Sequence, residues 1–191
     1  MKVGLYFGSF NPIHVGHLIL AQTALNESEL DAVWFIVSPQ NPFKQKKNLL
    51  SEFDRYRMVE LALEDHSQLQ ASNVEFSLPK PSYTIDTLTH LRDRYQSYDF
   101  ALIMGQDNLQ HFHKWKNYET IIKYYPLYVY PRVDAEASQF DDHPNVRFFE
   151  APLLNISASY IRKVIQADHS VRYMVVPKVF AYLEKEGLYR K

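Results

Sequence analysis

The chain has 191 residues, of which 46% are hydrophobic, and this is enough for one globular domain with its own core. The formal net charge of −1 at pH 7 argues against a protein that coats nucleic acid, because non-specific binders carry a basic excess. The absence of cysteine excludes disulfide bonds and thiolate metal sites. No signal peptide precedes the first apolar run, and no run approaches the ~18 residues of a membrane span. We therefore expect a soluble cytoplasmic protein, with no membrane or nucleic-acid partner and a single domain over residues 1–191.

Short apolar runs recur along the chain. Their hydrophobicity is continuous rather than alternating, which is typical of parallel strands that are buried on both faces. The predicted strands are Val3–Phe7, Ala32–Val37, Val74–Phe76, Phe100–Met104, Leu127–Tyr130 and Val146–Phe149.

Segments with helical periodicity alternate with these runs. The predicted helices are Gly16–Asn26, Glu52–Leu63, Ile85–Tyr95, Tyr118–Tyr124, Ala158–Ala167 and Lys178–Glu186. Ser51 and Asp54 resemble a capping box at the second helix, and the last helix lies between Pro177 and Gly187. Alternating strands and helices predict an α/β fold: a doubly wound, Rossmann-like parallel sheet with helices on both faces and a small helical C-terminal part.

The unusual residues of this sequence follow the predicted strands. Gly8-Ser9-Phe10-Asn11 comes after the first strand, Ser38-Pro39-Gln40-Asn41-Pro42 after the second, and Gly105-Gln106-Asp107-Asn108 after the fourth. Ligands of open α/β sheets bind outside the carboxyl ends of the strands. We therefore expect these three segments to form one site at one edge of the sheet.

The segment from Gly8 to His17 carries the strongest signal. If a helix begins at Gly16, the rings of His14 and His17 share one side of its N-terminus. That end of a helix has unpaired N–H groups and the positive pole of the dipole, which favour phosphate. No G-x-G-x-x-G or G-x-x-x-x-G-K-[ST] motif is present, so the dehydrogenase and P-loop alternatives lose their main support. The sequence predicts a site for a phosphate that reacts.

Two motifs at opposite ends of the chain resemble those of the nucleotidyltransferases. The segment from Gly8 to His17 matches the pattern G-x-F-x-P-x-H-x-G-H, and the segment from Ile156 to Arg162 is similar to I-S-x-T-x-I-R. Ser159 stands in place of the threonine of the second motif and keeps its hydroxyl group.

Further segments resemble the bacterial nicotinate-nucleotide adenylyltransferases in particular. They are Pro81–Leu88, with the sequence PSYTIDTL, Ile103–Leu109, and Trp115. The chain departs from that family at Phe43, where a histidine is usual between the proline and the lysine of a P-H-K motif. This departure puts one polar contact to the phosphates in doubt.

The resemblance implies adenylyl transfer from ATP to nicotinate mononucleotide, which gives deamido-NAD (nicotinate adenine dinucleotide) and pyrophosphate in NAD biosynthesis. Mg²⁺ would be bound with the ATP phosphates and by water, and we expect no metal ligand from protein side chains. His111 and His113 fit a polar segment better than a metal site. The sequence does not define the oligomeric state, and a homo-oligomer is compatible with it.

The resemblance also implies roles for individual residues. The catalytic residues would be His17 and His14. The ATP-binding residues would be Gly8, Ser9, Phe10, His14, His17, Gly105, Asp107, Ile156, Ser157, Ser159 and Arg162. The substrate-binding residues would be Asn11, Lys44, Tyr83, Thr84 and Trp115. We further expect Lys44 to lie on a mobile loop that closes over the phosphates.

Three of these residues have simpler explanations. Asp107 could be a turn residue, Trp115 a core residue and Thr84 the N-cap of a helix. Three other functions also remain open: adenylyl transfer to phosphopantetheine, transfer to the nicotinamide nucleotide, and a nucleotide sensor without turnover. PSYTIDTL and Trp115 argue against the first, and the intact motifs argue against the last.

Overall fold

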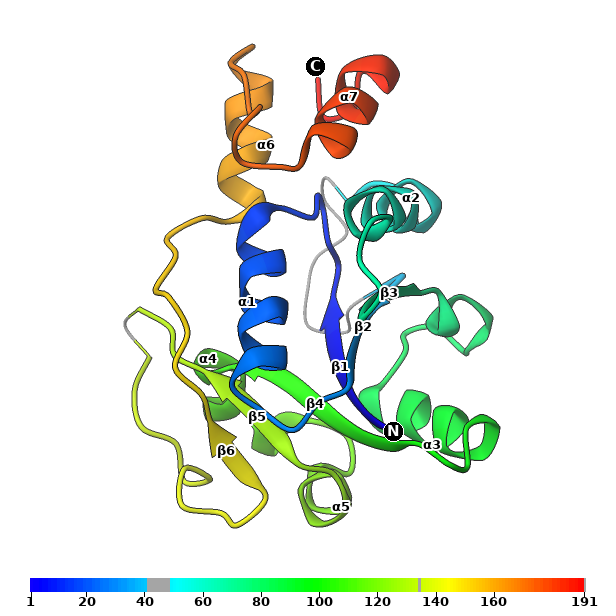
Figure 1. The fold of residues 1–191 in the computed structure, drawn as a ribbon, viewed down its shortest axis with the longest axis vertical. Helices are drawn as coiled ribbons and strands as arrows, with labels where there is room; N and C mark the ends of the chain where they lie inside the picture. Colours follow the sequence, from blue (N-terminus) through cyan, green and yellow to red (C-terminus); the bar gives the residue numbers. More distant parts are fainter. Residues whose placement is uncertain (41–48, 134, 191) are drawn as a thin grey trace.

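A six-stranded parallel sheet with the strand order β3-β2-β1-β4-β5-β6 forms the centre of the computed structural model, which describes residues 1–40, 49–133 and 135–190 (Figure 1). Every neighbouring pair of strands is parallel. The strands are β1 (Lys2–Gly8), β2 (Ala32–Val37), β3 (Leu69–Ser72), β4 (Asp99–Gly105), β5 (Leu127–Tyr130) and β6 (Val146–Phe148). The chain order changes direction between β1 and β4, so the carboxyl ends of these two strands flank the switch point where such sheets bind ligands.

Helices cover both faces of the sheet, as the sequence predicts. They are α1 (Val15–Asn26), α2 (Glu52–Leu63), η1 (Val74–Ser77), α3 (Thr84–Arg94), α4 (Gln106–Gln110), η2 (Phe112–Lys114), α5 (Tyr118–Tyr124), α6 (Ala158–Gln166) and α7 (Pro177–Glu186), where η denotes a 3₁₀-helix. These helices pack into two hydrophobic clusters. Helices α1, α2, α6 and α7 contribute to one cluster, and α3, α4 and α5 contribute to the other. The doubly wound α/β architecture is therefore confirmed.

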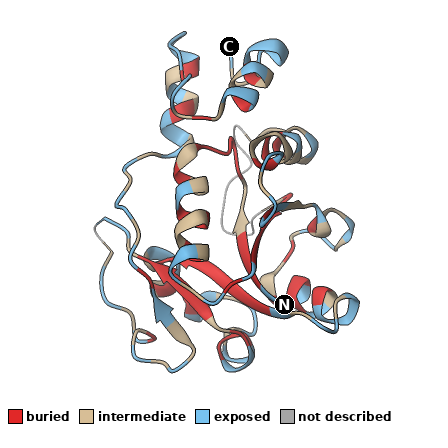
Figure 2. Ribbon diagram, in the orientation of Figure 1, coloured by how far each residue is buried: buried red, intermediate tan, exposed pale blue. Residues whose placement is uncertain are grey.

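The strands are buried on both faces, which explains their continuous hydrophobicity. All six residues of β2 are buried, and Figure 2 shows the central strands as the most buried part of the chain. Successive residues serve opposite clusters: Phe35 packs on the α1 side, whereas Trp34 and Ile36 pack on the α3 side. Full burial of a side chain such as Phe35 stabilises the fold by roughly 1.5–3 kcal/mol.

The predicted strand Val74–Phe76 is wrong. Residues 74–77 form the 3₁₀-helix η1, and the strand that pairs with β2 is Leu69–Ser72. That strand lies at the edge of the sheet and is only partly buried, so it does not need a continuous apolar run. The apolar residues of η1 pack as a helical turn instead.

The helix boundaries follow the predicted caps. At α2, the backbone N–H of Asp54 donates to the Ser51 hydroxyl at 3.1 Å. Helix α7 begins at Pro177 and ends at Glu186, and it is capped by Gly187, whose φ of 60° suits a glycine. Helix α4 and η2 were not predicted, because their polar residues have no clear hydrophobic period.

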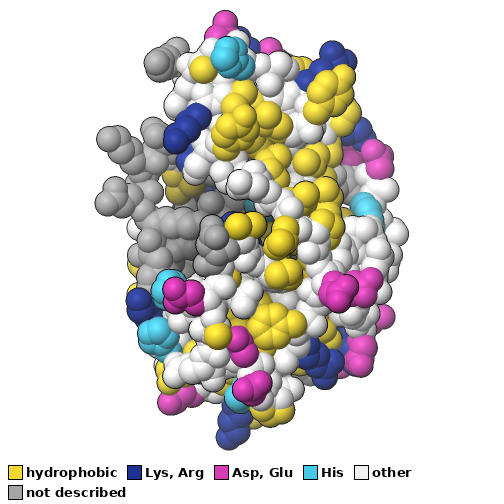
Figure 3. Space-filling view, turned by 90° about the vertical axis from the view of Figure 1, so that its left-hand side faces the viewer, with side chains coloured by type: hydrophobic (Ala, Val, Ile, Leu, Met, Phe, Trp, Pro, Cys, Tyr) yellow, Lys and Arg dark blue, Asp and Glu magenta, His cyan; other side chains and the backbone are white. Residues whose placement is uncertain are grey.

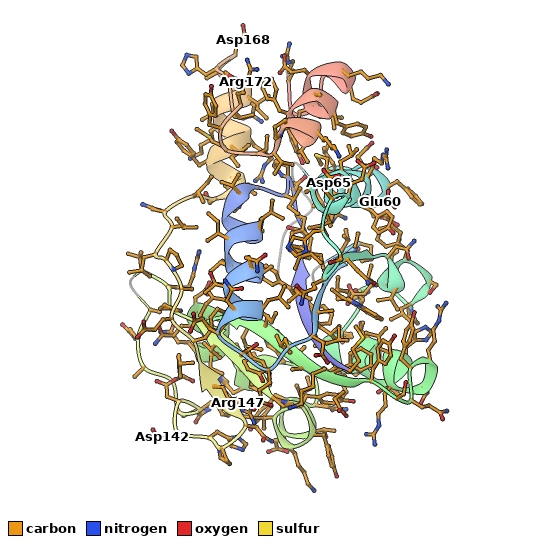
Figure 4. The ribbon with its side chains drawn as sticks, viewed as in Figure 1. Glu60, Asp65, Asp142, Arg147, Asp168 and Arg172 are labelled. Atoms are coloured by element: carbon orange, nitrogen blue, oxygen red, sulfur yellow. The ribbon has the colours of Figure 1, made fainter. Side chains whose placement is uncertain are left out.

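The C-terminal helices α6 and α7 lie together at one end of the molecule, next to the start of α1 and near α2 (Figure 1). Figure 4 labels Asp168 and Arg172 at this end, whereas Asp142 and Arg147 lie at the opposite end, near β6. This arrangement confirms the small helical C-terminal part and brings the last segment of the chain to the first motif. No helix within the described residues is long and apolar enough to cross a membrane.

One side of the molecule, seen in Figure 3, carries a band of hydrophobic side chains along its length, with charged groups toward its margins. The large hydrophobic side chains that remain exposed in the chain include Leu153, in the segment before α6, and Tyr160, within α6.

Candidate active site

The two predicted catalytic histidines lie against each other at the start of α1. His14 is the N-cap of the helix and His17 is its third residue. Their rings stack with centroids 3.7 Å apart, and the backbone N–H of His14 donates to Nδ1 of His17 at 3.2 Å. Because Nδ1 of His17 accepts this bond, the proton of the neutral ring is on Nε2. This bond favours the tautomer of His17 whose N–H donor is Nε2–H.

Gly16 allows the two ends of the chain to meet at this point. A Cβ atom at Gly16 would lie 2.7 Å from Cγ2 of Ile156 and 3.0 Å from Nδ1 of His14. The first distance is too short for a real Cβ contact, and the second is tighter than most such contacts. Glycine at this position therefore brings the first motif into contact with the second.

The second motif begins helix α6. Ser157 is the N-cap, and its hydroxyl accepts a hydrogen bond from the backbone N–H of Tyr160 at 3.2 Å. The guanidinium of Arg162 donates to the carbonyl oxygen of Asn11 at 2.7 Å and to the hydroxyl of Ser159 at 3.2 Å. Arg162 thus connects the two motifs directly.

Asn11 is held by the C-terminal segment as well. The Tyr189 hydroxyl donates to the Asn11 side-chain oxygen at 2.6 Å, and the backbone N–H of Leu50 reaches the same oxygen at 3.3 Å. Burial raises the pKa of Tyr189 well above its usual range, so its hydroxyl stays protonated and donates. The loop after β1 is therefore fixed from several distant parts of the chain.

A cavity of about 280 Å³ opens beside these residues, and we call it the histidine cavity. It collects most of the predicted ATP-binding residues. They are Gly8, Ser9, Phe10, His14, His17, Asp107, Ile156, Ser157 and Ser159. Gly105 and Arg162 are not part of its lining. Arg162, however, donates a hydrogen bond to Ser159, which does line the cavity.

A second cavity of about 250 Å³, the tryptophan cavity, contains Tyr83, Thr84 and Trp115 in its lining, together with Gly105. The two cavities share the walls formed by Tyr6, Phe7, Gly8, Ser9, Asn108 and Tyr130. Of the predicted substrate-binding residues, Asn11 does not line this cavity. Lys44 and the unusual Phe43 lie outside the described residues.

The start of α3 differs from the prediction by one residue. Tyr83, in an extended conformation, is the N-cap, and Thr84 is the first helical residue. Glu75, which is 2% exposed, fixes this helix start because its two carboxylate oxygens accept hydrogen bonds from Ser82 at 2.7 Å and Thr87 at 2.8 Å. The hydroxyl of Ser82 thus fixes the chain just before α3 by its bond to Glu75, and the helix begins directly after Tyr83. Burial raises the pKa of Glu75, while its hydrogen bonds oppose the shift.

Trp115 is half-buried, so it is neither a core residue nor free on the surface. Its ring centroid lies 5.3 Å from that of the buried Phe112, with an interplanar angle of 56°. Packing on one side and the cavity on the other leave an indole surface for a planar ligand.

Asp107 belongs to the first turn of α4, so it is not a simple turn residue. Its carboxylate lies 3.8 Å from Nε of Arg132. A Cβ atom at Gly105 would lie 2.3 Å from Oδ1 of Asp107 and 3.2 Å from the ring of Tyr130, so a larger residue at the end of β4 would require the Asp107 side chain to move. The carboxylate therefore lies close to the backbone of Gly105 in the lining of the histidine cavity.

The electrostatics of the histidine cavity keep His14 neutral. Burial lowers the pKa of His14 to about 4, and the positive charge of Arg132 adds to this effect. Arg132 also lines the cavity but was missed in the sequence. Its place just after β5 is the signal that could have identified it, since other site residues also follow strands.

Arg55 is a second residue that the sequence did not reveal. It is fully buried in α2 and donates to the carbonyl oxygens of Ser9 at 2.6 Å, Ser38 at 2.8 Å and Pro39 at 3.1 Å. Its Nε donates to the carbonyl oxygen of Leu50 at 3.1 Å. Arg55 therefore holds the loops after β1 and β2 together, and no local pattern distinguishes it from a surface arginine.

Within the described residues, no three His, Asp or Glu side chains gather closely enough to hold a metal ion.

The fold and the paired cavities define a nucleotidyltransferase-type protein, and the family model described as cytidylyltransferase-like matches residues 5–164. A protein of Cytophaga hutchinsonii named "Probable nicotinate-nucleotide adenylyltransferase" is 55% identical over 179 residues, which cover 94% of this chain and 93% of that protein. A protein of Flavobacterium psychrophilum with the same name is 46% identical over 193 residues, which cover 100% of both proteins. The chain belongs to the family of nicotinate-nucleotide adenylyltransferases.

A solved structure shows the same fold at low sequence identity. The nicotinic acid mononucleotide adenylyltransferase of Plasmodium falciparum, complexed with NaAD, has a TM-score of 0.83 and 19% identity. The similarity covers 98% of this chain and 97% of that one.

Proposed function

We propose that this protein transfers the adenylyl group of ATP to nicotinate mononucleotide, forming nicotinate adenine dinucleotide and pyrophosphate in NAD biosynthesis. The names of its close relatives support this activity. The observation that carries the assignment of the site is the pair of adjoining cavities with Gly8 and Ser9 in their common wall. Two nucleotides bound side by side would bring their phosphates together at this wall.

The histidine cavity is assigned to ATP and the tryptophan cavity to the acceptor. A phosphate oxygen of nicotinate mononucleotide attacks the α-phosphorus of ATP, and the bond from that phosphorus to the pyrophosphate oxygen breaks. The acceptor supplies the nucleophile, so no serine or cysteine nucleophile is required. Catalysis then depends on alignment and on stabilisation of the charge on the phosphates.

His17 is assigned the main role in charge stabilisation. Its Nε2–H donor is oriented by the bond from the His14 backbone to Nδ1, and the N-terminus of α1 adds its dipole. His14, kept neutral by burial, supports the ring of His17 by stacking and shapes the cavity. Fixed donors of this kind act without reorganisation when charge moves to the leaving group.

The second motif is assigned to the phosphate chain. Ser157 and Ser159 line the cavity, and Arg162 bonds to Ser159. Lys44 remains a predicted phosphate ligand from outside the described residues. Mg²⁺ enters as part of the MgATP substrate and is bound mainly by phosphate oxygens and water. Asp107 is placed to accept hydrogen bonds from ribose hydroxyls.

The tryptophan cavity is assigned to the pyridine nucleotide. The ring would stack on Trp115, and its carboxylate would accept from the backbone N–H groups at the start of α3, around Tyr83 and Thr84. The flexible chain of phosphopantetheine has no planar ring to stack on the indole of Trp115, which favours the nicotinate acceptor.

A pyrophosphate-release assay with MgATP and a set of acceptors tests this proposal. Nicotinate mononucleotide should give the highest kcat/KM, nicotinamide mononucleotide a value at least tenfold lower, and phosphopantetheine none. Mass spectrometry of the product should identify nicotinate adenine dinucleotide. Turnover of phosphopantetheine, or of no acceptor at all, would overturn the assignment.

A further inference from the structure

Lys116 lines the tryptophan cavity, and its positive charge has no part in the mechanism proposed above. Resting on the proposed function, we infer that Lys116 is a specificity-determining residue whose ammonium group attracts the ring carboxylate of the acceptor. It would thereby favour the nicotinate over the nicotinamide nucleotide.

Two neighbours fix the position of the Lys116 ammonium. Its Nζ lies 2.9 Å and 3.1 Å from the two carboxylate oxygens of Asp86, in the first turn of α3. It also lies 4.8 Å from the centroid of the Tyr83 ring. An ammonium has three N–H donors, and Asp86 uses at most two of them. At least one donor therefore remains for a ligand.

The charge balance of the cavity makes this donor significant. Among the described residues that line the tryptophan cavity, Glu75 and Lys116 are the charged ones. Glu75 is buried, and its two carboxylate oxygens accept hydrogen bonds from the hydroxyls of Ser82 and Thr87. Asp86, whose carboxylate pairs with Lys116, is not part of the lining. Lys116 is therefore the cationic group that this lining presents to a ligand, on the side of the cavity where the ring is assigned.

The location of Lys116 selects the ring carboxylate rather than the acceptor phosphate. Lys116 directly follows Trp115, on which the ring is assigned to stack, and contacts Tyr83 at the start of α3. The phosphate is assigned to the wall at Gly8 and Ser9, which the two cavities share. The Lys116 side chain is 45% exposed, so its attraction for an anion should weaken with salt.

The test compares Lys116→Gln with the wild-type protein, using both pyridine nucleotides at saturating MgATP. We expect kcat/KM for nicotinate mononucleotide to fall about tenfold, while the value for nicotinamide mononucleotide changes less than about twofold. The KM for ATP should be unchanged. Lys116→Arg should retain most of the preference for the acid.

Lys114→Gln is the matched control, because it removes the same charge from an exposed lysine that does not line the cavity. Its ratio of acid to amide kcat/KM should equal that of the wild type. Raising the salt concentration from 0.05 M to 0.5 M should lower the wild-type ratio and leave the Lys116→Gln ratio nearly constant. Thermal unfolding shows whether each variant is folded.

The outcomes separate this inference from the proposed function. An active wild-type protein with the same acid preference in Lys116→Gln would overturn the role of Lys116 alone. An equal loss for both nucleotides in Lys116→Gln would also overturn it, because that result indicates a general effect on the pocket. A wild-type protein that uses neither nucleotide would overturn the proposed function, and this inference with it.

Discussion

The histidine cavity and the tryptophan cavity adjoin each other but are constructed in different ways. Two short sequence motifs supply most of the polar lining of the histidine cavity, and each motif includes the start of a helix. The tryptophan cavity instead combines the ends of β1 and β4 with Glu75, the start of α3 and Trp115. Backbone donors at helix starts come from local sequence, whereas a shaped pocket for a ring needs segments that meet only in the folded chain.

The largest expected effect is on the histidine cavity. His17→Ala should lower kcat by about 10²–10³, because it removes a fixed donor from the reacting phosphate. The KM for nicotinate mononucleotide should change little, since His17 does not line the tryptophan cavity. Steady-state kinetics and circular dichroism measure both effects. His113→Ala, at an exposed histidine, is the control. Near wild-type turnover in a folded His17→Ala protein would contradict the assigned mechanism.

Acid should destabilise the fold through the same cavity. The pKa of His14 is about 4 in the folded protein and about 6.5 when it is unfolded, so the unfolded state binds more protons between these values. The free energy of unfolding should therefore fall by up to about 3 kcal/mol as the pH drops from 6.5 to 4.

Urea denaturation of the wild type and of His14→Gln at several pH values measures this contribution as the difference between the two proteins. The difference should stop changing above pH 7, where the histidine is neutral in both states, and only the pH-independent effect of the substitution on packing should remain. Parallel stability curves between pH 6.5 and 4 would show that His14 is not kept neutral by burial.

The tryptophan cavity should respond to Glu75→Ala. This change leaves the hydroxyls of Ser82 and Thr87 without their carboxylate and should cost about 2 kcal/mol of unfolding free energy. The KM for nicotinate mononucleotide should rise several-fold, because the start of α3 loses its anchor, while the KM for ATP stays constant. An increase in both KM values would mean that the two cavities are not independently constructed.

The pH dependence of the stability of Glu75→Gln gives a second comparison between the two cavities. The raised pKa of Glu75 means that the folded state binds more protons just above pH 4.5, so this group makes stability fall as the pH rises. The sign is opposite to that of His14. Relative to the wild type, Glu75→Gln should therefore gain stability as the pH rises through this window. A variant whose stability curve runs parallel to that of the wild type would contradict the burial effect.

The smallest effect is expected at the link between the C-terminus and the first motif. Tyr189→Phe removes the hydrogen bond to Asn11 and should lower the unfolding free energy by about 1 kcal/mol. Because Asn11 also accepts from Leu50 and Arg162, turnover should fall only a few-fold. Thermal unfolding and kinetics measure the change, with Tyr173→Phe, at a residue 90% exposed, as the control. An unchanged unfolding temperature would mean that this bond contributes nothing to the fold.

The sequence by itself determined the doubly wound sheet and the phosphate end of the site. Buried parallel strands require continuous apolar runs, and helix starts that bind phosphate require glycine, hydroxyl and imidazole groups at short, fixed spacings. Both requirements act over a few residues, so Gly8–His17 and Ile156–Arg162 could be recognised without coordinates.

The tertiary structure alone decided how these segments are held. Leu69–Ser72 became an edge strand because it pairs with β2, although its own residues are partly polar. Arg55 and Glu75 act through partners far along the chain, and their roles depend on burial, which no local pattern records. Packing therefore determined the pocket for the ring, because its walls come from segments that only the folded sheet brings together.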